Sequence, residues 1–544
     1  MRGLKFKDVH GGTNLSIATP SRTLLSHQSP HSTKRHKIQP QRNMRLSILR
    51  LQEDEVDQAE VDVNNVLLDK PTSTSTEAKH LDNEYVEKDK IIKKKLVVDT
   101  VAAYAKDLSS QNQVLSDISD ALEQKDDELQ AKIISGGYTN YSYKLYLRDR
   151  PDIAVFAKLS FPYALWNKDP DAYHDLIRTN NEHTVMKKIS SLIEDHSPVA
   201  TPFFVADVKQ DDADMKILCT EWTSRADEQF AMQWVDGKID RRVLPKIAST
   251  LAETNCCEDQ DFDDDFNNNI RDCCHSVFPM LRDLLEQLAS SADNTDRVAQ
   301  LVQEMGKDTC LALVDDCEHN FNERQVLVHS DSHAFNTLVE ATADGNEFGP
   351  DGELVLVDWE MAMMGPIGRD VGLAWTWPLS CLLAHSLLGN QEAKANISEA
   401  MAVLWDEYAD VLRSKGKDEE FLRTTYRNSI AWLGWFVFYV HYANGAQTEF
   451  LPIENVSEAD RKELFQSIGV ASLKLFDLGF STQGYYDDLT LDELREEMEL
   501  ILAEEIDYLD LIAKFRTRNP SNRESKLRLS AIDGRRISDA KIYH

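Results

Sequence analysis

The sequence predicts an α+β protein with two lobes, a small antiparallel β-rich N-lobe followed by a larger, mainly helical C-lobe. Strand patterns occur at residues 133–147, 154–159 and 216–222, with period-two alternation at Tyr141–Leu147, and long apolar helical stretches follow residue 372. Motifs rich in Asp, Glu and Asn lie between these regions, at residues 328–369. We therefore place the N-lobe at residues 95–223 and the C-lobe at residues 224–480 of the 544-residue chain.

Both ends of the chain look like additions to this unit. The first 50 residues contain ten Lys or Arg and a single acid, Asp8, without a compact apolar run. They predict a disordered tail, with an organellar transit segment as the alternative, and residues 1–94 are assigned to tail and linker. Residues 481–544 form a C-terminal extension, in which an amphipathic helical pattern at Leu489–Ile512 precedes a basic, disordered tail.

The loop at Val328–Asn336 has the pattern H-x-D-x-x-x-x-N, and a D-x-E follows at Asp358 and Glu360. Phosphoryl transfer needs a carboxylate that orients the acceptor hydroxyl and accepts its proton, and oxygen ligands that hold Mg²⁺ against the phosphates of ATP. Asp331 suits the first task, and Asn336, Asp358 and Glu360 suit the second. For H-x-D alone, an Asp that caps a turn would be the ordinary interpretation.

The D-x-E motif is predicted to lie at a strand end. A period of two would place Asp358 and Glu360 on one face of the strand, with Trp359 on the other. Two such acids repel each other unless a cation lies between them. The motif therefore predicts a cation site.

A glycine hairpin in the N-lobe is a candidate for phosphate contact. Ile133–Leu147 predicts two strands joined by a turn at Gly136 and Gly137, where glycine relieves the steric cost of positive φ. Such a hairpin, with Asn140 at the start of its second strand, can fold over the phosphates of ATP.

The next strand, Ala154–Leu159, places Lys158 among apolar neighbours, where an ammonium group needs an anion. An ATP phosphate and a helix carboxylate would supply it. Glu182, in the helical pattern Thr179–Leu192, is our choice for this carboxylate, with Asp175 as the alternative.

A hinge between the lobes is predicted after a further strand, Lys216–Trp222. The backbone near Glu221 and Trp222 would meet the adenine of ATP. These two residues complete the predicted nucleotide site.

In this order, the motifs resemble those of small-molecule kinases built on the protein-kinase-like fold, a group that includes aminoglycoside phosphotransferases, choline kinases and 5-methylthioribose kinase. The resemblance spans roughly residues 98–476. The D-x-E, the phrase GPIGRDVG at Gly365–Gly372 and the run KLSFPYA at Lys158–Ala164 are most similar to 5-methylthioribose kinase. The resemblance implies a homodimer as well.

The resemblance also implies roles for single residues. Lys158 would contact ATP, Asp331 would be the catalytic residue, and Asp358 with Glu360 would bind magnesium. Asp370 would be a buried acid that braces the catalytic loop, with His329 as a second structural support.

The chain departs from the family pattern at three places. Ser330 stands where the family loop usually has glycine, which requires a backbone angle that a serine tolerates. Asn336 follows the aminoglycoside and choline kinases instead of 5-methylthioribose kinase. Residues 431–445 lack the adjacent arginines that 5-methylthioribose kinases present near the sugar, and the nearest polar groups are His441 and Asn444. The same stretch is rich in aromatic residues: Trp432, Trp435, Phe436, Phe438, Tyr439 and Tyr442.

The net charge of −33 argues against broad binding to nucleic acid or to anionic membranes. The acidic stretch 253–272 predicts a solvated insertion, because it lacks the central glycine and closing Glu of a calcium loop. The eight cysteines include the doublets Cys256-Cys257 and Cys273-Cys274, whose spacing disfavours a zinc site, so reduced thiols are expected. The apolar stretch Gly372–Leu388 contains Pro378 and predicts a buried helix, not a membrane span.

The sequence thus predicts a cytoplasmic kinase that uses ATP and Mg²⁺ to phosphorylate a hydroxyl of a small molecule, with a 5-methylthioribose-like sugar as the leading acceptor. Choline, ethanolamine and aminoglycosides are the alternative acceptors. A catalytically silent pseudokinase that binds nucleotide or serves as a scaffold is the alternative from another class. A protein kinase is disfavoured, since D-F-G and A-P-E segments are missing from the expected region.

Overall fold

A computed structural model describes residues 93–518, apart from residues 126, 135–139, 163–175, 193–198, 211–212, 224–225, 258–269, 271–276, 341–351, 446–447, 481–485 and 487. All described residues belong to one compact unit, Thr74–His544. The predictions for the N-terminal tail, the Gly136-Gly137 turn, Asp175, the Cys273-Cys274 doublet, most of the acidic insertion and the C-terminal tail fall outside the described residues.

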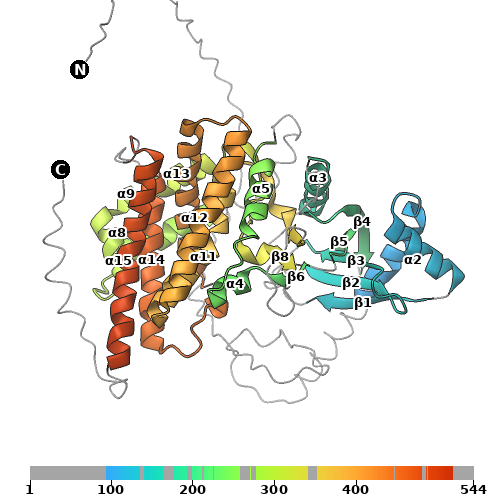
Figure 1. Cartoon of the computed structure of the whole chain (residues 1–544), viewed down its shortest axis with the longest axis horizontal. Helices are drawn as coiled ribbons and strands as arrows, with labels where there is room; N and C mark the ends of the chain where they lie inside the picture. The colour runs from blue at the N-terminus through green and yellow to red at the C-terminus, as the bar shows by residue number, and fades with distance from the viewer. Residues whose placement is uncertain are drawn as a thin grey trace, which may run out of the picture. The chain divides into compact units, whose positions relative to one another are not determined.

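The N-lobe is built on a five-stranded antiparallel sheet with strand order β1-β2-β3-β5-β4 (Figure 1). Its strands are β1 (Leu129–Ile134), β2 (Tyr141–Leu147), β3 (Ala154–Ser160), β4 (Pro202–Gln210) and β5 (Ala213–Glu221). In β2, the alternate residues Tyr143, Leu145 and Leu147 are buried, as expected for a strand with one face on a core. The helix α3 (Ile177–Leu192) connects β3 to β4.

Two helices that precede the sheet complete the N-lobe core. Helical residues 93–108 and α2 (Gln113–Gln124) share one apolar cluster with the sheet. Val101 and Ile118 are fully buried in this cluster, and the ring of Tyr104 stacks on Phe204 with centroids 4.3 Å apart. Both helices therefore pack as part of the N-lobe.

The C-lobe is mainly helical. Its α-helices are α4 (Ala231–Asp236), α5 (Leu244–Thr254), α7 (Val277–Ala289), α8 (Arg297–Met305), α9 (Lys307–Phe321), α10 (Arg369–Ala374), α11 (Thr376–Leu388), α12 (Gln391–Ser414), α13 (Glu419–Phe436), α14 (Glu458–Phe480) and α15 (Leu491–Arg518). Helices α11, α14 and α15 lie side by side (Figure 1). The predicted α+β fold, with a β-rich N-lobe and a helical C-lobe, is confirmed.

Two small sheets in the C-lobe carry the polar motifs. Strand β7 (Val326–Val328) pairs with β10 (Met363–Gly365), and a second sheet has the order β6-β8-β9. The strands of that sheet are β6 (Ala226–Gln229), β8 (Thr337–Glu340) and β9 (Leu354–Leu356). The loop from β7 to β8 holds the H-x-D motif, and the link from β9 to β10 holds the D-x-E, so the pairing brings the two motifs together.

The phrase GPIGRDVG is explained by close helix packing. Helix α10 crosses α13 so closely that a Cβ on Gly372 would lie 2.5 Å from the carbonyl oxygen of Ser429. Gly368 has φ +88°, and a Cβ there would lie 2.4 Å from the carbonyl oxygen of Thr425. Only glycine fits both positions, and this contact fixes the helix that carries Asp370.

Within the described residues, the stretch Arg369–Leu388 is long and apolar enough to cross a bilayer, with a mean hydropathy of 1.3 over its best window. Of that window, 94% is buried inside the protein. It forms two consecutive interior helices, α10 and α11, where the sequence predicted one buried helix.

Candidate active site

The loop after β7 is held by the buried carboxylate of Asp370. One oxygen accepts a hydrogen bond from the backbone N–H of Ser330 and the other from that of His329, each at 2.9 Å. The hydroxyl of Ser332 donates to the backbone carbonyl of Asp370 at 2.7 Å. Asp370 therefore sits where a brace for the catalytic loop was predicted.

A second layer around Asp370 was missed by sequence reasoning. The Asn255 amide donates to Asp370 Oδ2 at 3.1 Å and to the Leu327 carbonyl at 2.7 Å, and the hydroxyl of Tyr408 donates to Asn255 Oδ1 at 2.7 Å. Asn255 ends α5 and Tyr408 lies in the middle of α12. No motif marks either residue, because their role depends on the packing of α5 against α12.

His329 is a structural support in its neutral form. Its Nε2 lies 3.1 Å from the Val357 carbonyl, and its Nδ1 accepts the backbone N–H of Asp331 at 3.3 Å. A carbonyl only accepts and an amide N–H only donates, so the proton is on Nε2. Burial lowers the pKa of His329, which agrees with this neutral ring, and Trp359 packs against it with centroids 4.2 Å apart.

Ser330 has φ +65°, in the left-handed region that favours glycine. We expected serine to be tolerated here only at an ordinary backbone angle. The observed angle is not ordinary. The strained backbone is retained because the N–H groups of His329 and of Ser330 itself are both fixed on Asp370.

Asp331 is oriented by its neighbours in the loop. Asn336, at the end of the short 3₁₀ turn Ala334–Asn336, donates its amide to Asp331 Oδ2 at 3.1 Å and to the Asp331 backbone carbonyl at 2.8 Å. His333 Nε2 lies 3.4 Å from Asp331 Oδ1. The five-residue spacing thus brings Asp331 and Asn336 into contact, although Asn336 addresses Asp331 and not the acids of the D-x-E.

Lys158 is the centre of a buried ionic cluster that joins the two lobes. Its Nζ lies 3.0 Å from Glu182 Oε2 and 2.9 Å from Glu360 Oε2, and it also contacts Asp358 Oδ1. The predicted pairing of Lys158 with Glu182 is present. The ammonium group of Lys158 also contacts both Asp358 and Glu360, and the predicted metal site at these acids stays a prediction.

The predicted strand geometry of the D-x-E is wrong. Strand β9 ends at Leu356, Asp358 has left-handed φ and ψ of 68° and 53°, and Trp359–Met361 form a 3₁₀ turn. Trp359 is fully buried and donates its Nε1–H to the Leu356 carbonyl at 2.9 Å. Both acids meet at Lys158 because the chain turns sharply at Asp358, not because a strand alternates.

Burial and charge set the pKa values in this cluster. Burial raises the pKa of Glu182 to about 7, against the attraction of Lys158. Burial would raise the pKa of Glu360 too, but Lys158, Arg178 and the Asn140 amide outweigh it and lower the value to about 2. Burial alone would lower the pKa of Lys158, yet the three carboxylates hold it above its ordinary value. Glu360 is therefore the acid that stays ionised most firmly.

Asn140 and Arg178 lie beside this cluster. The Asn140 amide donates to Glu360 Oε2 at 3.1 Å, and Arg178 donates to Asn140 Oδ1 at 3.1 Å. Asn140 was predicted to contact ATP, and in the structure its side chain makes hydrogen bonds with Glu360 and Arg178. Arg178 was missed, since an arginine at the start of a helix pattern looks like an ordinary surface cation.

The predicted adenine contacts lie at the end of β5. Glu221 pairs with Val155 of β3 and is exposed, and Trp222 is half-buried with Lys144 Nζ 4.6 Å from its ring. Their role toward nucleotide stays a prediction.

Aromatic rings lie next to His333 in the loop after β7. The His333 ring lies 6.0 Å from Phe335 and 6.4 Å from Phe436, and Phe335 in turn lies 5.2 Å from Phe450. Phe335 is half-buried and Phe450 is 40% exposed. We call Phe335 and Phe450 the aromatic edge.

The two polar groups predicted near the acceptor both make hydrogen bonds to other parts of the chain. His441 is fully buried in the π-helical turn Val437–Ala443, with Nδ1 2.7 Å from the hydroxyl of Ser380. Asn444 donates its amide to the Tyr439 carbonyl at 2.6 Å and so closes that turn. Neither group replaces the missing arginines. The aromatic residues of this stretch are mainly core, because Trp432, Trp435, Phe436 and Phe438 are all buried.

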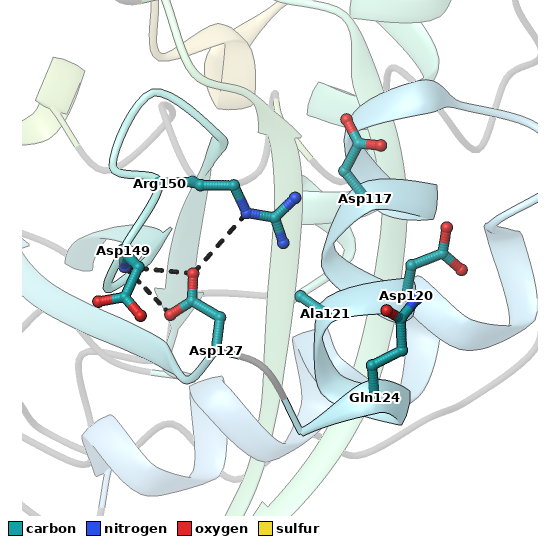
Figure 2. Close-up of a pocket in the computed structure, with 7 residues that line it drawn as sticks. All are labelled: Asp117, Asp120, Ala121, Gln124, Asp127, Asp149 and Arg150. Carbon is teal, nitrogen blue, oxygen red and sulfur yellow. Dashed lines mark hydrogen bonds and ion pairs between the residues drawn. The ribbon is translucent and has the colours of Figure 1, made fainter.

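A pocket of about 400 Å³ lies apart from these residues, on the N-lobe (Figure 2). It is lined by Asp117, Asp120, Ala121, Gln124, Asp127, Asp149 and Arg150. Asp127 accepts the backbone N–H groups of Glu128 and Asp149 at 2.7 Å and 3.1 Å. Its carboxylate therefore fixes the backbone where α2 leads into β1.

The donor set of the ionic cluster fits a magnesium ion. Glu182, Asp358 and Glu360 place carboxylate oxygens within 4.8 Å of one another, and hard oxygen donors are the ligands that Mg²⁺ takes in proteins. The described cysteines Cys219, Cys256, Cys257, Cys310, Cys317 and Cys381 are free thiols.

Comparison with known proteins gives one family match. Residues 130–399 match the model of the phosphotransferase enzyme family, APH. This match supports the predicted superfamily and does not distinguish 5-methylthioribose kinase within it. No relative among curated proteins matches the chain in sequence.

Solved structures are similar at low identity. A Plasmodium vivax ethanolamine kinase shares 12% identity, with 69% of this chain and 83% of that chain covered and a TM-score of 0.31. An aminoglycoside phosphotransferase in complex with GDP and kanamycin shares 12% identity, with 72% and 96% covered and a TM-score of 0.27. The GDP complex of a mutant aminoglycoside 2'-phosphotransferase shares 12%, with 75% and 99% covered and a TM-score of 0.28.

Proposed function

We propose that the protein is an ATP-dependent kinase that transfers the γ-phosphoryl group to a hydroxyl of a small molecule. The observation that carries this proposal is the convergence of Lys158 and Glu182 from the N-lobe with Asp358 and Glu360 from the C-lobe, next to the braced loop of Asp331. Asp331 lies close enough to Asp358 to raise its pKa, after the larger effects of burial, Lys158 and Glu360. A lysine grouped with several carboxylates in this way is typical of sites that bind phosphates together with a divalent cation.

Each residue has a task in this mechanism. Asp331 accepts the proton of the acceptor hydroxyl, and Asn336 keeps its carboxylate in place. Lys158 contacts the phosphates. Asp358 and Glu360 would hold Mg²⁺, which would supply positive charge to neutralise the phosphates.

The leading acceptor remains a 5-methylthioribose-like sugar. The D-x-E and the GPIGRDVG phrase support it, and the structure gives this phrase a packing role in fixing Asp370. The lack of arginine at residues 431–445 means that other groups would have to bind the sugar hydroxyls.

An amino alcohol such as choline or ethanolamine is the second candidate. The aromatic edge favours it, because aromatic faces attract ammonium groups and the edge lies one residue, His333, away from Asp331. Aminoglycosides carry several ammonium groups and belong in the same test.

The deciding experiment is a turnover assay with purified protein, Mg²⁺ and ATP. The acceptor panel contains 5-methylthioribose, choline, ethanolamine, aminoglycosides and simple sugars, and ADP release and product mass are followed. Asp331→Asn should lower turnover ~10²- to 10⁴-fold, because it removes the proton acceptor and keeps the volume.

The nucleotide-induced rise in melting temperature is the control, and it should persist in Asp331→Asn. Release of ADP at the same rate with and without every acceptor would count against the proposal. If wild-type protein is stabilised by nucleotide but phosphorylates no acceptor, the pseudokinase is the better description.

A further inference from the structure

Arg178 is a buried cation with a defined set of partners. Its side chain is 3% exposed, and it lies at the start of α3, four residues before Glu182. Its Nη2 donates to Asn140 Oδ1 at 3.1 Å and to the Phe161 carbonyl at 3.4 Å. A guanidinium group stays charged when buried, so its environment must supply acceptors and a counter-charge.

The counter-charge is Glu360. Arg178 Nε lies 3.8 Å from Glu360 Oε2, and Asn140 donates its amide to the same oxygen at 3.1 Å. Lys158 Nζ approaches this oxygen as well, at 2.9 Å. Arg178, Asn140 and Lys158 therefore all approach the same oxygen of Glu360, Oε2.

The Arg178 and Asn140 contacts differ from the Lys158 contact in one respect. Lys158 is shared among three carboxylates and is the predicted phosphate contact, whereas among the described residues the acidic partner of Arg178 is Glu360. When Lys158 turns to a phosphate, Glu360 keeps Arg178 and Asn140. These contacts also cross between lobes, since Asn140 and Arg178 belong to the N-lobe and Glu360 to the C-lobe.

We infer that Arg178, acting through Asn140 and directly, is a positioning residue that holds Glu360 Oε2 and so presents Oε1 to the divalent cation. The inference rests on the proposed function, in which Glu360 is a metal ligand. Groups that orient a ligand in this way typically change metal affinity 10- to 100-fold when removed.

The test compares Arg178→Met and Asn140→Ala with wild type. Two constants are measured: the Mg²⁺ concentration that half-saturates turnover at saturating ATP, and the dissociation constant of Mn²⁺ from the ADP complex by calorimetry. Both should rise ~10-fold or more in each variant, while the KM for ATP at saturating Mg²⁺ changes little. In the double variant, the fold-increase of each metal constant over wild type should be smaller than the product of the two single fold-increases, because the residues act as one unit.

Two further variants separate positioning from stability. Arg178→Lys keeps the charge but not the planar fork, so it should restore part of the metal affinity. Arg297→Lys weakens a buried ion pair with Glu505, far along the chain in the C-lobe, and should lower the melting temperature without changing either metal constant.

The inference is overturned if Arg178→Met and Asn140→Ala lower only the melting temperature, as Arg297→Lys does, and leave both metal constants at the wild-type value. Failure of the proposed function looks different. In that case the wild-type protein itself would bind no Mn²⁺ with ADP, and the inference would fall with it.

Discussion

At the scale of single residues, Ser330 shows how the catalytic loop stores strain. Its φ of +65° costs a non-glycine residue about 1 kcal/mol. Its buried hydroxyl also has no hydrogen-bond partner among the described residues. Two unfavourable features at one position, next to Asp331, indicate that the Asp370 brace determines the loop conformation.

Ser330→Gly should therefore stabilise the protein. Relief of the strained angle and removal of the buried hydroxyl outweigh the entropy that glycine adds to the unfolded chain, so we expect a gain of about 1 kcal/mol. The measurement is the free energy of unfolding in urea.

Ser332→Gly in the same loop is the matched control, since Ser332 donates its hydroxyl to the Asp370 carbonyl. It should lower the free energy of unfolding by about 1 kcal/mol or more. If Ser330→Gly and Ser332→Gly lower the free energy of unfolding equally, relief of strain at Ser330 does not stabilise the protein.

The site residues that the sequence predicted are those whose chemistry is needed at a fixed spacing. Lys158, Glu182, Asp331 and the two acids of the D-x-E belong to this group, and the structure brings them together. Arg178, Asn255 and Tyr408 could not be predicted. Each acts through a contact between elements distant in sequence, and each has a side chain that is common on helix surfaces.

At the scale of elements, period-two alternation located β2, and apolar runs located β3 and β5 within a few residues. Neither pattern located β4, and alternation predicted a strand end at Asp358, where the chain instead adopts a left-handed angle and a 3₁₀ turn. An alternating pattern of two acids cannot reveal such a turn, because the same spacing also fits a sharp bend. Helix α15 was predicted as an extension, and its packing on α11 and α14 was not visible in the sequence.

Helix α15 is held to the C-lobe by a buried ion pair. Glu505 is 2% exposed, and Arg297 Nη2 lies 2.7 Å and 2.8 Å from its two oxygens. Arg297 also donates to the Ser467 hydroxyl at 3.0 Å and lies 4.0 Å from the centroid of the Tyr508 ring. The pair connects α8, α14 and α15.

Arg297→Met should destabilise the protein by about 3–5 kcal/mol, because it leaves the Glu505 carboxylate buried without its partner. The addition of Glu505→Gln should recover part of this loss, since it removes the stranded charge. Chemical denaturation of both variants measures the two values. A loss below about 1 kcal/mol in Arg297→Met would mean that α15 can swing away and expose Glu505 to water.

At the scale of the whole molecule, the ionic cluster around Lys158 is an electrostatic connection between the lobes. Three carboxylates share one ammonium group, and only Glu360 has the additional support of Arg178 and Asn140. The cluster therefore holds excess negative charge. Glu182, which lacks that support and is buried, is the group that takes up a proton first, as its pKa of about 7 indicates.

This arrangement predicts a pH dependence of global stability. The pKa of Glu182 is raised from 4.5 to about 7, so between these values the native state holds a proton that the unfolded state has released. The free energy of unfolding should then fall as pH rises from about 5 to 7.5, by up to about 3 kcal/mol from this group. Glu182→Gln cannot titrate and should lose this slope. Urea denaturation of both proteins at four pH values, in buffer without nucleotide or metal, measures the difference; parallel curves would show that Glu182 is already ionised across this range.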